Sequence, residues 1–212
     1  MSRYLTVMEE STAEYVEKRS RFIATLRHCE TEGEAVAFIE EMRSKYWDAR
    51  HNVFAYSVAK GTLCRFSDDG EPHGTAGKPI LDVINGNEIT NVAIVVTRYF
   101  GGVLLGTGGL VRAYSTSSRD AVLNAKIVEM IPCTRFYILC DYQDHQKLVY
   151  LIEGENGVIE NTEFTDKVKV SFVFKDEECQ GFLAKLTEVF SARLGAVETE
   201  KCIFPYEISK KL

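Results

Sequence analysis

The chain has 212 residues, 45% hydrophobic and 26% charged, with a formal net charge of −6 at pH 7. This acidic balance argues against tight non-specific binding to DNA or RNA, because such binding rests on neutralisation of phosphates by lysine and arginine. No apolar run approaches the ~20 residues that cross a bilayer, and the first residues lack the pattern of a secretion signal, so we expect a cytoplasmic chain without membrane contact.

The first 132 residues predict an alternation of strands and helices. Residues 12–28 alternate as one or two strands that bend near Lys18. Thr31 and Glu34 have the spacing of a capping box, and apolar residues at helical spacing follow up to about Tyr46. Further along we expect a strand over 51–59, a polar loop over 60–74, a helix over 75–85, a buried strand over 91–97, a helix over 110–124 and a short strand over 127–131.

Pro132 is predicted to mark a boundary between two domains, 1–132 and 133–212. Beyond it the periodicity predicts the order βαββαβ, which is that of a ferredoxin-like domain. Thr165 and Asp166 suit a tight hairpin between two of its strands. The expected strands are 134–141, 157–164, 167–174 and 199–207, and the expected helices are 144–153 and 176–194. The fold class is therefore α+β with two domains.

A glycine-rich segment follows the predicted strand at 91–97. It has five glycines in nine positions and leads into a helix. Glycine permits positive φ or close approach to another group, and we expect Gly108 to need a positive φ. Free N–H groups at a helix start favour anions. An anion-binding loop and a purely structural turn both remain open for these glycines, which are Gly101, Gly102, Gly106, Gly108 and Gly109.

A second polar segment runs from Asp68 to Lys78 and includes Asp69, Glu71 and His73. These side chains have the chemistry to bind a divalent cation or to act as acid and base, but their spacing fits neither an EF-hand nor a zinc site. We therefore predict no metal site and favour a solvated loop whose aspartates hold backbone N–H groups. Neither polar segment has the frame of a phosphate loop or of a dinucleotide fingerprint, so no cofactor is predicted.

Two arginines are the strongest candidates for binding. Arg98 ends a strand and Arg112 lies one turn into the following helix, so both can face the glycine-rich segment from either side. The planar guanidinium suits phosphate or carboxylate. The alternative is a salt bridge to Asp68, Asp69 or Glu71 that pins the two segments together, and both interpretations stay open.

No Ser-His-Asp or Cys-His arrangement can be assigned from the spacing. His51 and His73 are candidate general bases. Cys64 stands beside a cation, which can lower a thiol pKa, although a buried cysteine is more usual. Tyr99 and Phe100 have rings that can stack on bases, but we expect them to fill the core at the end of a strand. The six cysteines form no Cys-x-x-Cys pair and are expected to be reduced thiols.

Four stretches of the chain resemble the YigZ/IMPACT family. They are residues 18–24 (KRSRFIA), 49–52 (ARHN), 65–79 (RFSDDGEPHGTAGKP) and, the longest, 91–115. The resemblance implies an N-terminal domain like domain IV of elongation factor G, which is a ribosomal protein S5 domain 2-like β/α unit, and a ferredoxin-like C-terminal domain like its domain V. It also implies a link to translation, because the eukaryotic relatives regulate translation through a protein partner.

Two hypotheses follow from the residues and the resemblance. The first is a non-catalytic binding protein in regulation of translation that engages RNA, the ribosome or a protein partner through the Asp68–Lys78 and Arg98–Arg112 loops. The second is a small-molecule hydrolase or other enzyme, with His73 or Asp69 as base and an anionic substrate held by the arginines. We favour the first hypothesis because no catalytic set is evident. The sequence leaves the ligand and the oligomeric state open.

Overall fold

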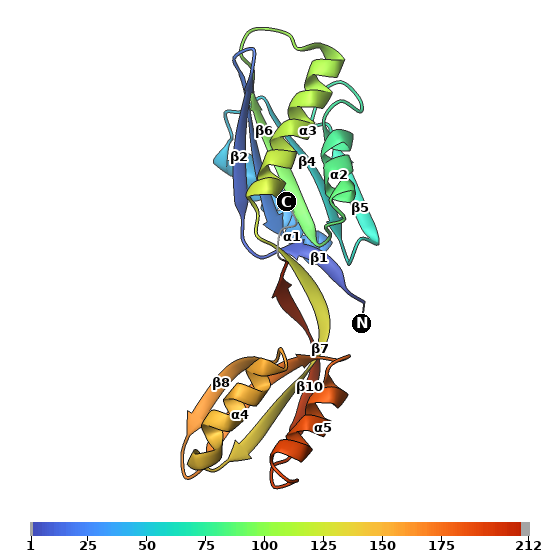
Figure 1. Cartoon of the computed structure of the whole chain (residues 1–212). Helices are drawn as coiled ribbons and strands as arrows, with labels where there is room; N and C mark the ends of the chain where they lie inside the picture. The colour runs from blue at the N-terminus through green and yellow to red at the C-terminus, as the bar shows by residue number, and fades with distance from the viewer. Residues whose placement is uncertain (1, 209–212) are drawn as a thin grey trace. The chain divides into compact units, whose positions relative to one another are not determined.

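The structure is a computed structural model that describes residues 2–208 (Figure 1). The chain divides into two compact units, a first unit formed mainly by residues 4–129 and a second formed mainly by residues 130–206. The expected α+β class with two sheets is confirmed. Within residues 2–208 no helix is both long and apolar enough to cross a membrane.

The first unit is built on a five-stranded antiparallel sheet with the order β2-β3-β6-β4-β5. The predicted bend near Lys18 is confirmed as a turn, in which Lys18 and Arg19 have positive φ angles. A short strand, β1 (Tyr4–Val7), pairs instead with β7. The five strands of the sheet are β2 (Ser11–Glu17), β3 (Ser20–His28), β6 (Val92–Tyr99), β4 (His51–Val58) and β5 (Leu63–Ser67).

Helices cover both faces of this sheet. Side chains of its central strands are therefore buried on both faces, alternating between them along each strand. Val53 and Ala55 of β4 pack with the helices α2 (Gly77–Gly86) and α3 (Gly106–Asn124) on one face. Tyr56 and Val58 pack with α1 (Glu32–Lys45) on the other face. The predicted capping box at the start of α1 is confirmed, with both Thr31 and Glu34 hydrogen bonds present.

The predicted extents of one loop, one helix and one strand of the first unit are wrong. Residues 60–74 are not all loop, because β5 lies among them as an edge strand whose side chains are mostly exposed. The helix expected from residue 110 begins at Gly106. The strand expected over 127–131 does not end before Pro132 but runs on as β7 (Ile127–Cys140).

The second unit has the predicted βαββαβ order. Its strands lie in the order β10-β7-β9-β8, with β7 and β9 as the central strands and the pairs β7–β9 and β8–β9 antiparallel. Phe172, Phe174 and Phe182 dominate its buried core. The hairpin between β8 and β9 is one residue longer than the two-residue turn expected. The remaining bounds are α4 (Tyr142–Gly154), β8 (Val158–Phe164), β9 (Val168–Lys175), α5 (Cys179–Val189) and β10 (Val197–Glu207).

Candidate functional site

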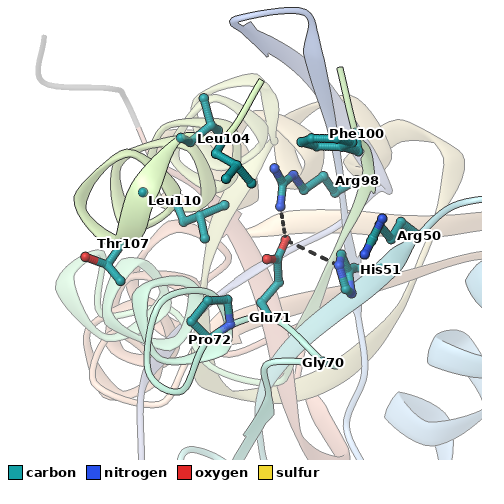
Figure 2. A pocket seen from close by; sticks show the side chains of 12 residues that line it. Arg50, His51, Gly70, Glu71, Pro72, Arg98, Phe100, Leu104, Thr107 and Leu110 are labelled. Carbon is teal, nitrogen blue, oxygen red and sulfur yellow. Dashed lines mark hydrogen bonds and ion pairs between the residues drawn. The ribbon is translucent and has the colours of Figure 1, made fainter. Parts of the chain in front are cut away.

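A pocket of about 420 Å³ opens in the first unit where β4 begins and β6 ends (Figure 2). These two strands are antiparallel, and their register places His51 directly opposite Arg98. The loop after β5 and the start of α3 complete the wall. The lining residues are Arg50 and His51, then Gly70, Glu71 and Pro72, then Arg98 and Phe100, and finally Leu104, Leu105, Gly106, Thr107 and Leu110.

A buried carboxylate lies in the wall of this pocket. Oε1 of Glu71 accepts hydrogen bonds from Nη1 of Arg98 at 2.5 Å and from the hydroxyl of Tyr114 at 2.8 Å. The side chains of Glu71 and Arg98 are only 4% and 6% exposed. Burial, followed by the charge and hydrogen bond of Glu71, raises the pKa of Tyr114 far above its usual value. Removing either member of such a pair leaves an uncompensated buried charge, so this contact holds the 68–78 loop on the sheet.

The guanidinium of Arg98 makes two further contacts with aromatic rings. Its Cζ lies 5.4 Å from the ring centre of Phe22 and 5.6 Å from that of Phe100, within the range of cation–π attraction. Its Nε is buried and finds no acceptor among residues 2–208. Arg98 therefore keeps one unsatisfied N–H. An unpaired buried donor of this kind costs about 1–3 kcal/mol.

The rim of the pocket is cationic and apolar. Arg50 lies with its Cζ 5.9 Å from the ring centre of Phe100, and its backbone N–H donates to the carbonyl of Arg98. Phe100 is 41% exposed and Leu104 is 83% exposed. The expectation that Phe100 fills the core is therefore wrong, because the chain leaves the sheet at this point and turns the ring outward.

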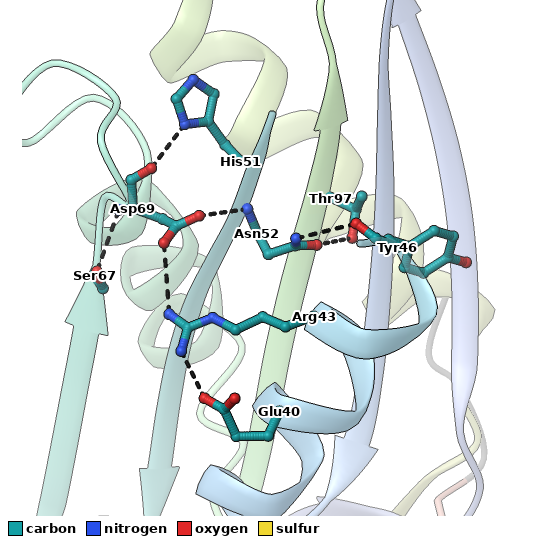
Figure 3. A network of polar contacts seen from close by, with 8 residues as sticks. All are labelled: Glu40, Arg43, Tyr46, His51, Asn52, Ser67, Asp69 and Thr97. Atoms are coloured by element: carbon teal, nitrogen blue, oxygen red, sulfur yellow. Dashed lines mark hydrogen bonds and ion pairs between the residues drawn. The ribbon is translucent and has the colours of Figure 1, made fainter. Parts of the chain in front are cut away.

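A polar network fixes the floor beside the pocket (Figure 3). The carboxylate of Asp69 accepts from the backbone N–H of Asn52 at 2.7 Å and from Arg43 at 3.5 Å. The carbonyl of Asp69 lies 2.7 Å from Nδ1 of His51. Because a carbonyl only accepts, Nδ1 carries the proton, and Nε2 is left facing Glu71 at 3.9 Å. Asp69 thus orients His51 and ties the loop to β4.

The glycines at the start of α3 have different roles. At Gly101 a Cβ would overlap the backbone of Arg19 and Ser20, so the close approach is a packing requirement. Gly102 and Gly106 have φ angles of +83° and +71°. Gly108 lies within the helix without a positive φ and with open space around its Cβ position, so the expectation that it needs a positive φ is wrong.

The amino-terminal end of α3 has free donors. Among residues 2–208 no side chain caps it, and its first turn has no acidic residue. Gly106 and Thr107 from this turn line the pocket. Free N–H groups and the helix dipole give this end of the pocket a partial positive charge.

The sequence matches known proteins over both units. Residues 18–122 match the Impact N-terminal domain, and residues 138–193 match a domain of unknown function, DUF1949. IMPACT family member YvyE of Bacillus subtilis is 32% identical over 93% of this chain and 91% of its own length. IMPACT family member YigZ of Escherichia coli is 34% identical over 93% of this chain and 95% of its own. The chain belongs to the IMPACT family.

A solved structure is similar to this IMPACT-family chain over nearly its whole length. The crystal structure of a hypothetical protein is 33% identical, has a TM-score of 0.61 and covers 94% of this chain and 98% of its own. Every residue that lines the pocket lies within the segment matched by the Impact N-terminal domain. The pocket therefore lies within the matched Impact N-terminal domain.

The candidate residues of the 68–78 loop divide in two groups. Asp68 accepts from the backbone N–H groups of Gly74, Ala76 and Gly77, which confirms that this aspartate holds the loop at the start of α2. His73 and Lys78 lie outside the pocket lining. The side chain of His73 is 99% exposed, and Lys78 pairs with Asp82 one turn along the helix.

Arg98 and Arg112 do not converge on the pocket. Arg112 is exposed on α3, within electrostatic range of Tyr15 on β2, and does not line the pocket. The alternative of a salt bridge is confirmed for Arg98, whose partner is Glu71. Sequence reasoning missed Arg50 as a rim residue and Tyr114 as a donor to Glu71, and the only local signal was the position of Arg50 next to His51 before a strand.

Proposed function

We propose that this IMPACT-family chain is a cytoplasmic, non-catalytic binding protein in the regulation of translation, and that the pocket is the surface that meets its partner. The observation that carries the proposal is the burial of Glu71 against Arg98 and Tyr114. A carboxylate used in this way anchors the loop and is not free to move a proton. The pocket would then bind a partner through its shape and through the cations and apolar side chains of its rim.

The family resemblance supports the link to translation, because the eukaryotic relatives regulate translation through a protein partner. It supports the place of binding as well, since the pocket lies inside the matched Impact N-terminal domain. The exposed Leu104 and Phe100 at the rim support a binding role, because apolar side chains of this size are often found where partners dock.

The test is co-purification of the full chain from gently lysed cells over a series of salt concentrations, with bound RNA and protein both identified. Arg50→Ala removes a rim cation, and Arg119→Ala, an exposed arginine of α3 outside the pocket lining, is the matched control. We expect ribosomal or translation components to be retained by the wild type and the control and lost by Arg50→Ala. Equal retention by all three proteins, or retention of nothing from translation, would contradict the proposal.

One observation favours an enzyme as the second candidate. Nε2 of His51 lines the pocket and is held at 3.9 Å from Glu71 by the bond from Nδ1 to Asp69. The Nε2 atom in this position can act as a base toward an anionic substrate. A hydrolysis screen with small phosphate and carboxylate esters tests this, and turnover that disappears in His51→Gln with unchanged stability would establish it.

A further inference from the structure

We propose that the partner bound at the pocket is single-stranded RNA, with a backbone phosphate at the amino end of α3 and bases on the aromatic side chains around it. This inference rests on the proposed function and names the chemistry of its partner. The surface involved, which we term the loop end, consists of Lys18, Arg19, Trp47, Arg50 and Phe100 together with the first turn of α3.

The loop end gathers unpaired cations in an acidic chain. The turn that carries Lys18 and Arg19 touches the glycine-rich connection, because Gly101 lies against the backbone of Arg19 and donates its N–H to Oγ of Ser20 at 3.1 Å. Arg50 approaches from the other side, over Phe100. Throughout residues 2–208, neither the two cations of the turn nor Arg50 forms an ion pair with a carboxylate. This supplies the local basic patch that the net charge of −6 does not reveal.

Aromatic rings are interleaved with these cations. Trp47 is 83% exposed in the turn between α1 and β4, and Phe100 is 41% exposed. The hydroxyl of Tyr99 donates to Asp48 at 2.8 Å, which holds the turn of Trp47 beside the end of β6. Exposed rings alternating with cations are the usual platform for single-stranded nucleic acid, since every base can stack on an aromatic face.

The seat for a phosphate is argued from two independent observations. The first turn of α3 has uncapped N–H groups, and the Nε donor of Arg98, a residue that lines the pocket, is buried without a partner.

Gly108→Ala adds one methyl group to the first turn of α3, next to Thr107, which lines the pocket. Binding of a 12-nucleotide uridine RNA is measured by the fluorescence of Trp47, the one tryptophan of the chain. We expect Gly108→Ala to weaken binding about fivefold while leaving thermal stability equal or higher. Gly181→Ala is the matched control, because Gly181 is also the third residue of its helix and also has open space around its Cβ position.

Two further variants test the platform. We expect Phe100→Ala to weaken binding about tenfold, because a stacked base is lost, and Phe66→Ala, at the same 41% exposure, to leave it unchanged. We expect Arg50→Ala to reduce the slope of log affinity against log salt by about 1, with Arg119→Ala unchanged.

Three outcomes would overturn the inference. The first is no binding of the RNA by the wild type, and the second is equal loss in Gly108→Ala and Gly181→Ala. The third is binding of uridine monophosphate or inorganic phosphate as tight as that of the RNA, which would make a small anion the ligand. In each case the proposed function still stands if translation components co-purify in a manner that depends on Arg50.

Discussion

The two units treat polar side chains in opposite ways. The first unit buries the Arg98–Glu71 pair next to a pocket, whereas the second keeps its clusters nearer the surface, as where Arg135 bridges Glu160 and Glu200. The core of the second unit is mostly phenylalanine and aliphatic side chains. A buried ion pair is seldom the most stable way to fill a space. Hydrophobic packing therefore accounts for the interior of the second unit, but it does not account for the buried Arg98–Glu71 pair of the first. This difference is the reason that we place the candidate site in the first unit.

The largest expected effect tests this contrast directly. Arg98→Ala leaves Glu71 charged and buried, and we expect a loss of about 3–5 kcal/mol in the free energy of unfolding. Arg135→Ala breaks two partly exposed pairs in the second unit and should cost about 1 kcal/mol or less. Urea denaturation of both variants measures the difference, and equal losses would break the comparison.

The next largest losses in the free energy of unfolding are expected for substitutions at two closely packed glycines. We expect Gly101→Ala to cost about 3 kcal/mol, because the new methyl group would overlap the backbone of Arg19 and Ser20. In the second unit Gly157→Ala would overlap the side chains of Phe174 and Ile152 rather than backbone, so a smaller loss of about 1–2 kcal/mol is expected. Thermal unfolding ranks the two variants, and the reverse order would contradict this account.

A smaller effect is expected for two tyrosine hydroxyls. Tyr114→Phe removes a buried hydrogen bond to the charged Glu71 and should cost about 1.5 kcal/mol. Tyr142→Phe removes an exposed hydrogen bond to the carbonyl of Thr165 and should cost about 0.5 kcal/mol. Chemical denaturation resolves this difference only if the two changes leave the rest of the structure intact, which circular dichroism checks.

The smallest effect concerns thiol reactivity and leaves stability unchanged. Cys64 is exposed on β5, contrary to the usual burial of cysteine, while burial raises the pKa of Cys133 on β7 to about 11. At pH 8 the Cys133 thiol is almost fully protonated, and its reaction should speed up as the pH rises. A thiol reagent should therefore modify Cys64 first, and Cys64→Ser should remove that fast phase. Fast modification of Cys133 in the folded protein would be inconsistent with its burial.

Much of the fold could be predicted because its signals are local. The capping box of Thr31 and Glu34 depends on residues three apart, and it is present as predicted. The strand β5 was missed because its side chains are mostly exposed and show no alternation. The start of α3 was placed too late, since Gly106 and Gly108 disfavour a helix locally and only tertiary packing extends the helix over them.

The candidate site was less predictable, because it depends on pairing between distant segments. Arg98 could be named as a candidate, but its partner Glu71 follows from how the 68–78 loop returns to the sheet. The position of His51 opposite Arg98 follows from strand register, which the spacing along the chain does not contain. Exposure of Phe100 likewise depends on the direction in which the chain leaves β6.

The close approach of Gly101 to the β2–β3 turn has a practical consequence for anyone who modifies this protein. A tag or dye inserted beside Lys18 would push on the connection that forms the pocket rim. The exposed turn after β8 is a better position for such an attachment, because Thr165 and Lys167 close it by contacts of their own within the second unit. Immobilisation on a sensor surface is therefore best made through residues 165–167, which keeps the loop end intact for measurement.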